Sequence, residues 1–157
     1  MKKFIPLIIL LLVIFISSSQ TYEQQSIVPT LETYFPSKPL EPLLSKLHFH
    51  YYGMEISVES RGYYYFLEFL IRKAAHFVTF GAIGIAILLA LSNFKQRILI
   101  SILMSFLFAI MDETHQYFTS GRSASFQDVL LDTSGAITFI VIFIFIRKLI
   151  RKKPTKA

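Results

Sequence analysis

The fold of this chain is decided by the run from Ile98 to Phe118, ILISILMSFLFAIMDETHQYF. Its apolar part, Ile98 to Met111, has 14 residues. A helix of that length reaches about 21 Å, whereas the hydrocarbon core of a bilayer is about 30 Å thick. A helix that continues to Phe118 is about 31 Å long and can cross the membrane. The polar residues of this segment are therefore predicted to lie below the membrane surface.

Three further apolar runs, at 4–16, 74–91 and 129–146, accompany this segment in a chain of 157 residues that is 54% hydrophobic. This pattern predicts an all-α membrane protein, a bundle of four transmembrane helices in a single domain. We expect spans at about 4–20, 72–91, 97–118 and 128–146. The segment 21–71 is expected outside the cytoplasm, and 147–157 forms a basic tail.

The charged residues predict the orientation of these spans. Ten of the 16 basic residues lie at the N-terminus, in the loop between the second and third spans, or in the tail. This positive-inside pattern places both termini in the cytoplasm and all ten carboxylates on the other side of the membrane. Because the basic residues cluster at span ends, where they meet anionic lipid, we expect no nucleic-acid partner. The chain has no cysteine, which excludes disulfides and thiolate chemistry.

Two segments near the N-terminus need separate interpretation. The first apolar run, followed by Ser17, Ser18 and Ser19, also has the form of a cleaved signal peptide, and this alternative stays open. In the outside segment, four prolines predict an irregular loop. Apolar and polar residues alternate over 47–52 and 54–59, on either side of Gly53, and this alternation predicts a short hairpin. The segment 63–71 is predicted to form an interfacial helix that leads into the second span.

Ionisable residues inside a bilayer normally face the bundle interior and pair with one another. Pairs four residues apart share a helix face, as Arg72 does with His76 and Asp128 with Asp132. Small residues at Gly81, Gly84 and Gly135 would let the helices approach closely. We therefore predict a pocket that opens outward, formed by the second, third and fourth spans. Its residues would be Arg72, Lys73, His76, Asp112, Glu113, His115, Gln116, Arg122, Asp128 and Asp132.

Three separated motifs carry a resemblance to a known family. They are Arg72-Lys73-Ala-Ala-His76-Phe, then Asp112-Glu113-Thr-His115-Gln116-Tyr-Phe with Gly121-Arg122, then Asp128 through Asp132 to Gly135. In order and interval they resemble the VanZ-like family of bacterial membrane proteins, over about residues 45–146. The family often has Asn where this chain has Asp132. The resemblance implies a small multi-pass protein of the bacterial plasma membrane, in a family whose founding member is associated with low-level resistance to the glycopeptide antibiotic teicoplanin. It implies no settled biochemical activity.

The leading functional hypothesis is recognition or modification of an anionic cell-envelope component, a membrane lipid or a lipid-linked cell-wall precursor. Arginine suits phosphate because its planar fork donates two charge-assisted bonds. Arg72, Lys73 and Arg122 would bind the anion, and Asp112, Gln116 and Asp128 would orient the ligand. Asp132 is also assigned to the ligand-binding site. No cofactor is expected.

Three alternatives remain open. In an intramembrane hydrolase or transferase, His76, Asp112, Glu113 and His115 would exchange protons with a lipid-linked substrate. The same four residues offer nitrogen and oxygen ligands for a metal, although they lack the paired-histidine helix of a metalloprotease, so no metal site is assigned. Finally, the polar pairs could serve only to lock the helices together or to bind a partner protein.

Overall fold

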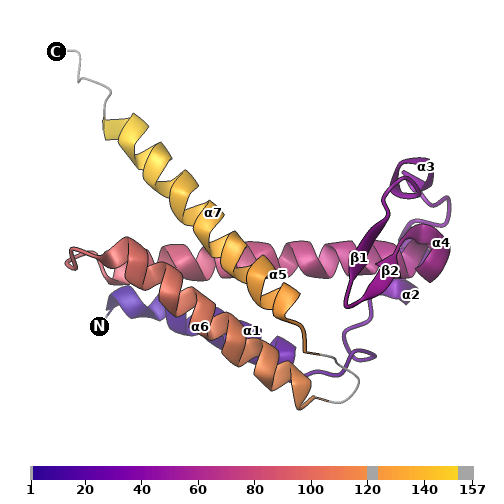
Figure 1. Cartoon of the computed structure of the whole chain (residues 1–157), viewed down its shortest axis with the longest axis horizontal. Coiled ribbons are helices and arrows are strands. Elements are labelled where there is room, and N and C mark those ends of the chain that lie inside the picture. Colours follow the sequence, from indigo (N-terminus) through magenta and orange to yellow (C-terminus); the bar gives the residue numbers. More distant parts are fainter. Residues whose placement is uncertain (1, 120–123, 152–157) are drawn as a thin grey trace.

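The computed structural model describes residues 2–119 and 124–151, and it is mainly helical (Figure 1). Its elements in order are η1 Lys2–Phe4, α1 Ile5–Ser18, α2 Val28–Tyr34, α3 Glu41–Leu44, β1 Phe49–Tyr51, β2 Met54–Ile56, α4 Val58–Arg61, α5 Tyr63–Ala90, α6 Arg97–Tyr117 and α7 Phe126–Arg151. The long helices α5, α6 and α7 form a bundle with α1, while the short elements gather around the N-terminal part of α5 (Figure 1).

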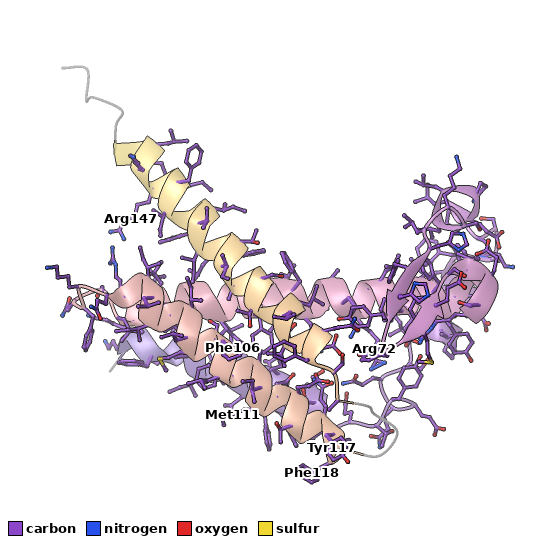
Figure 2. The ribbon with its side chains drawn as sticks, in the orientation of Figure 1. Arg72, Phe106, Met111, Tyr117, Phe118 and Arg147 are labelled. Carbon is purple, nitrogen blue, oxygen red and sulfur yellow. The ribbon has the colours of Figure 1, made fainter. Side chains whose placement is uncertain are left out.

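Within the described residues, three helices are long and apolar enough to cross a membrane: α5, α6 and α7. Much of their surface is apolar and exposed. Met111 and Phe118 of the α6 segment, for example, project away from the other helices (Figure 2) and are 65% and 78% exposed. Contiguous apolar surface on this scale is rare on soluble monomers, whereas a lipid-facing surface requires it. The chain is therefore a helical protein with three candidate membrane spans.

The N-terminal helix differs from its prediction. Instead of a span over about 4–20, α1 has 14 residues and ends at Ser18. At 1.5 Å per residue it is about 21 Å long, short of the hydrocarbon thickness. The fourth predicted span is thus not confirmed. Even so, α1 belongs to the bundle, because Leu7 and Ile14 are buried in one core cluster with Phe80 and Ile83 of α5 and Ala109 of α6.

Helix α5 is longer than predicted, with 28 residues from Tyr63 to Ala90. The segment expected as a separate interfacial helix, 63–71, is its first part and continues into the span without a break. No proline or glycine interrupts this stretch, so nothing in the backbone ends the first helix. As a result, Arg72 and Lys73 lie inside a rigid helix and not at its end.

Small residues bring α5 and α7 together, as the sequence predicted. A β-carbon added at Gly135 would lie 2.2 Å from the carbonyl oxygen of Phe77, and one added at Gly84 would lie 3.0 Å from the β-carbon of Ala136. The two backbones touch at these points. Because Gly135 follows Asp132 by less than one turn and Phe77 follows His76, this contact fixes the carboxylate beside the imidazole.

The predicted hairpin is present as β1 and β2, antiparallel, with Phe49 paired to Ile56 and Tyr51 to Met54. Its two-residue turn, Tyr52-Gly53, has positive φ at both positions, 56° and 70°, as a type I′ turn requires. A second core cluster, centred on Ile56, Phe66 and Phe69, packs the hairpin on α5. The turn is thereby held over the start of α7.

Candidate functional site

The centre of the candidate site is a group of three side chains from the three long helices. The Nδ1 atom of His76 on α5 lies 3.4 Å from Oδ2 of Asp132 on α7 and 4.0 Å from Oδ2 of Asp112 on α6. Asp112 and Asp132 are only 7% and 3% exposed. For these three residues, the structure brings side chains from the three spans together, as the sequence predicts.

Asp112 is held in place by neutral donors. Its Oδ1 accepts a hydrogen bond of 2.5 Å from the Ser18 hydroxyl at the end of α1, and its Oδ2 accepts one of 2.6 Å from the Gln116 amide. Gln116 lies one turn further along α6, on the same helix face as Asp112. Asp132 is less well satisfied, because its buried Oδ1 has no hydrogen-bond partner among the described residues.

Asp128, one turn before Asp132, has different partners. It forms an ion pair with Lys73 of α5, and it accepts hydrogen bonds from the hydroxyls of Tyr51, at 2.6 Å, and Tyr52. Burial, followed by the hydrogen bond to Asp128, raises the pKa of both tyrosines well above the ordinary value. These phenols therefore stay protonated as donors, and the hairpin turn is tied to the start of α7.

Arg72 contacts the loop that follows α1. It does not pair with Glu68, although Glu68 lies one turn before it on α5. Its guanidinium donates to the side-chain oxygen of Gln25 and lies 4.8 Å from the centre of the Tyr22 ring. Glu68 instead accepts hydrogen bonds from the Tyr22 hydroxyl, at 3.1 Å, and from the Ile27 amide, at 2.8 Å. Arg72 thus has no carboxylate within 4 Å in the part of the chain described, and its buried Nη1 is without a hydrogen-bond partner.

A cleft of about 220 Å³ opens beside these groups. It lies between the hairpin and the bundle, next to the labelled Arg72 in Figure 2. Of the predicted site residues, it is lined by Arg72, Lys73, His76, Glu113, Gln116 and Asp128. Asp112 and Asp132 lie behind His76, buried under this lining.

Among the predicted residues, His115 lies apart from His76, Glu113 also contacts the entry to α7, and Arg122 is not described. His115 stacks on Phe15 of α1 with ring centres 4.6 Å apart, and its Nε2 is 3.5 Å from the Ser19 hydroxyl, so it contacts α1 and not His76. Glu113 accepts a 2.5 Å hydrogen bond from the Ser125 amide at the entry to α7. Arg122 lies outside the described residues, and so its predicted role as an anion ligand stays a prediction.

Several residues of the site were not assigned from the sequence. Arg61, at the end of α4, lines the cleft, and so do Tyr22 and Gln25. No motif marks them, because they come from the irregular outside segment and reach the site only through tertiary packing. For Tyr52, the predicted hairpin was the feature of the sequence that could have indicated a place in the site, because a tight turn at Tyr52-Gly53 that packs on the bundle brings this side chain to it.

Fold and site together define a helical membrane protein whose polar residues converge at one end of three candidate spans. The chain belongs to the VanZ/LLP1 family, whose sequence profile matches residues 3–147. The resemblance drawn from the three motifs is thereby confirmed. Neither the curated proteins nor the solved structures contain a significant match to the chain.

Proposed function

We propose that this protein binds an anionic component of the cell envelope in the cleft beside Arg72. The observation that supports the proposal best is the guanidinium of Arg72, which lines the cleft and has no carboxylate within 4 Å among the described residues, while its buried Nη1 has no hydrogen-bond partner there. An unpaired charged group of this kind costs more than about 1–3 kcal/mol, so a ligand that accepts from the guanidinium would bind favourably. Phosphate oxygens suit this planar fork.

Arg61 adds a second cation to the same cleft. Its guanidinium lies 5.4 Å from the centre of the Phe69 ring, and no carboxylate lies within 4 Å among the described residues. Lys73, in contrast, is neutralised by Asp128 and surrounded by the rings of Tyr51, Tyr52 and Phe69. The anion is therefore bound by Arg72 and Arg61, while Lys73 and Asp128 hold the hairpin over the cleft.

The proposal includes a topology in which the cleft faces outward. Lys3 donates to Ser92 in the loop between α5 and α6, which places the N-terminus at that end of the bundle. Arg97, Arg147 and Lys148 line a second cavity at the same end, together with Ser92. Basic residues from three parts of the chain thus gather opposite the cleft, as positive-inside topology requires. In this topology η1 and α1 form a short first crossing.

The ligand is proposed to be a phospholipid or a lipid-linked cell-wall precursor, because both present a phosphate beside apolar chains. The head group would lie in the cleft and the chains along the exposed apolar surface of the bundle. By binding such a component, the protein would lower sensitivity to glycopeptide antibiotics such as teicoplanin, in keeping with its family. Mass spectrometry of the lipids that copurify distinguishes the two classes of ligand by their masses.

The test compares Arg72→Gln with wild-type protein purified in mild detergent. Losing a charge-assisted hydrogen bond weakens binding by about 1.5–3 kcal/mol, or about 10- to 150-fold. We expect phosphate-containing lipid to copurify with the wild type and with Lys46→Gln, an exposed control, and to be depleted in Arg72→Gln. Equal and nonselective lipid content in all three proteins would refute the proposal.

A second candidate function is general acid/base catalysis on the bound component, which one observation favours. His76 lines the cleft and has two buried carboxylates behind it, an arrangement that suits proton transfer. A His76→Gln protein that keeps its lipid but loses its effect on teicoplanin sensitivity would support catalysis. One that keeps both would exclude His76 as the acid/base group.

A further inference from the structure

In the described part of the chain, no lysine or arginine lies within 4 Å of the group formed by His76, Asp112 and Asp132. Two carboxylates lie together at 7% and 3% exposure, and Lys73, which precedes His76 by three residues on α5, is paired with Asp128. Buried carboxylates normally pair with cations or coordinate a metal. The only basic group within 4 Å of either, in the described part of the chain, is the His76 imidazole.

One atom of the group has no partner. Asp132 is almost fully buried, yet its Oδ1 makes no hydrogen bond within the described residues. A purely structural role for this pair does not explain the unpaired oxygen. If Asp132 served only to hold the helices together, both of its oxygens would be expected to accept hydrogen bonds. The vacant acceptor points instead to a positively charged ligand between the three helices.

The spacing of the donor atoms fits an ion. One donor atom from each of the three side chains can be chosen so that all lie within 4.8 Å of one another, and the histidine–aspartate distances are 3.4 and 4.0 Å. Around a tetrahedral zinc ion with bonds of about 2.0–2.2 Å, neighbouring donor atoms are about 3.4 Å apart. The three residues are thus nearly at the separations that one ion would impose.

The outer contacts resemble those that usually support metal ligands. Asp112 is fixed by Ser18 and Gln116, two neutral donors that orient a carboxylate without neutralising it. The close contact of Gly135 with Phe77 fixes the helices that carry Asp132 and His76. An entry path exists as well, since His76 lines the cleft.

We infer that His76, Asp112 and Asp132 bind a divalent transition-metal ion of the zinc type between α5, α6 and α7. One nitrogen and two carboxylate ligands suit zinc, and the ion balances both carboxylates. The cleft supplies the remaining coordination position. This inference rests on geometry and burial at the three residues, and it holds whether or not an anionic lipid binds beside Arg72.

The test is the zinc content of full-length protein in detergent after equilibration with zinc and removal of the free ion. We expect about one zinc per chain for the wild type. Asp132→Asn keeps the shape of the side chain and removes its charge, and we expect it to lose most of the zinc. Glu32→Gln, an exposed control on α2, should keep it. Zinc should also raise the melting temperature of the wild type and the control, but not of Asp132→Asn.

A second measurement covers the case in which Asp132→Asn does not fold. Cobalt in place of zinc gives visible absorption bands whose intensity reports a tetrahedral site, and these bands should change in His76→Gln. A wild-type protein that retains no zinc and shows no zinc-dependent melting shift would overturn the inference, as would equal zinc in Asp132→Asn and wild type. Arg72→Gln should keep its zinc while losing lipid, which separates this proposal from the previous one.

Discussion

Asp128 and Asp132 lie one turn apart on α7, share a face and yet have different roles. Asp128 meets three donors, from Lys73, Tyr51 and Tyr52, whereas among the described residues the side chain of Asp132 is bonded only to His76. Their shared face follows from the spacing of four residues, and the sequence predicts it. Their partners do not follow from spacing, because the tyrosines come from a hairpin more than 70 positions away.

Removing the Asp128 carboxylate should release the hairpin. Asp128→Ala leaves the Lys73 ammonium and two tyrosine hydroxyls without their acceptor in a largely buried site. Breaking such a pair from one side costs about 3–5 kcal/mol when it is fully buried, and we expect about 3 kcal/mol here. The free energy of unfolding measured by titration with a denaturing detergent checks the value. Glu32→Ala is the control, and equal stability of both variants would contradict the role of Asp128.

At the scale of elements, the contact between α5 and α7 positions the site. The sequence predicts it from small residues at Gly81, Gly84 and Gly135, and the structure places all three at the interface. The sequence also predicts the start of α6 at residue 97 and the short hairpin. It does not predict that 63–90 is one helix or that α1 stops at Ser18, because hydropathy locates apolar lengths and not the ends of helices.

Gly135 tests this interface. A β-carbon there would lie 2.2 Å from the Phe77 carbonyl oxygen, which belongs to a helix backbone and cannot turn away. Gly135→Ala should therefore separate α5 from α7 and lower stability by about 1–3 kcal/mol, although alanine favours helices. The melting temperature in detergent is the measurement. Ser134→Ala, on the exposed side of α7, should change it little.

The opposite result would be informative. A Gly135→Ala protein as stable as Ser134→Ala would mean that the two helices do not touch at Phe77. In that case His76 and Asp132 would not be held together by the backbones, and the group with Asp112 would lose its structural support.

At the scale of the whole molecule, charge and polarity divide along the bundle. Basic side chains gather at the end of the bundle where Lys3 contacts Ser92. The two carboxylates that His76 contacts lie towards the other end, beneath the hairpin. Figure 2 shows Arg147 at the far end of α7, away from Arg72. The sequence predicts this division from hydropathy and charge alone. It could not predict Arg61 and Gln25 in the cleft, since nothing in the irregular segment 21–62 specifies how it folds back.

The proposals about an envelope ligand all require that the cleft face the outside of the cell. Because the chain has no cysteine, single cysteines can report this without background. Met54 lines the cleft and is 54% exposed, and Phe94, in the loop between α5 and α6, is 58% exposed. Both positions are accessible in the folded protein, so only the membrane should protect one of them.

The decisive measurement is the labelling of Met54→Cys and Phe94→Cys in intact cells with a thiol reagent that cannot cross the membrane. We predict rapid labelling of Met54→Cys, and labelling of Phe94→Cys only after the cells are permeabilised. Labelling of Phe94→Cys in intact cells, with Met54→Cys protected, would contradict an outward-facing cleft and with it the proposed ligand.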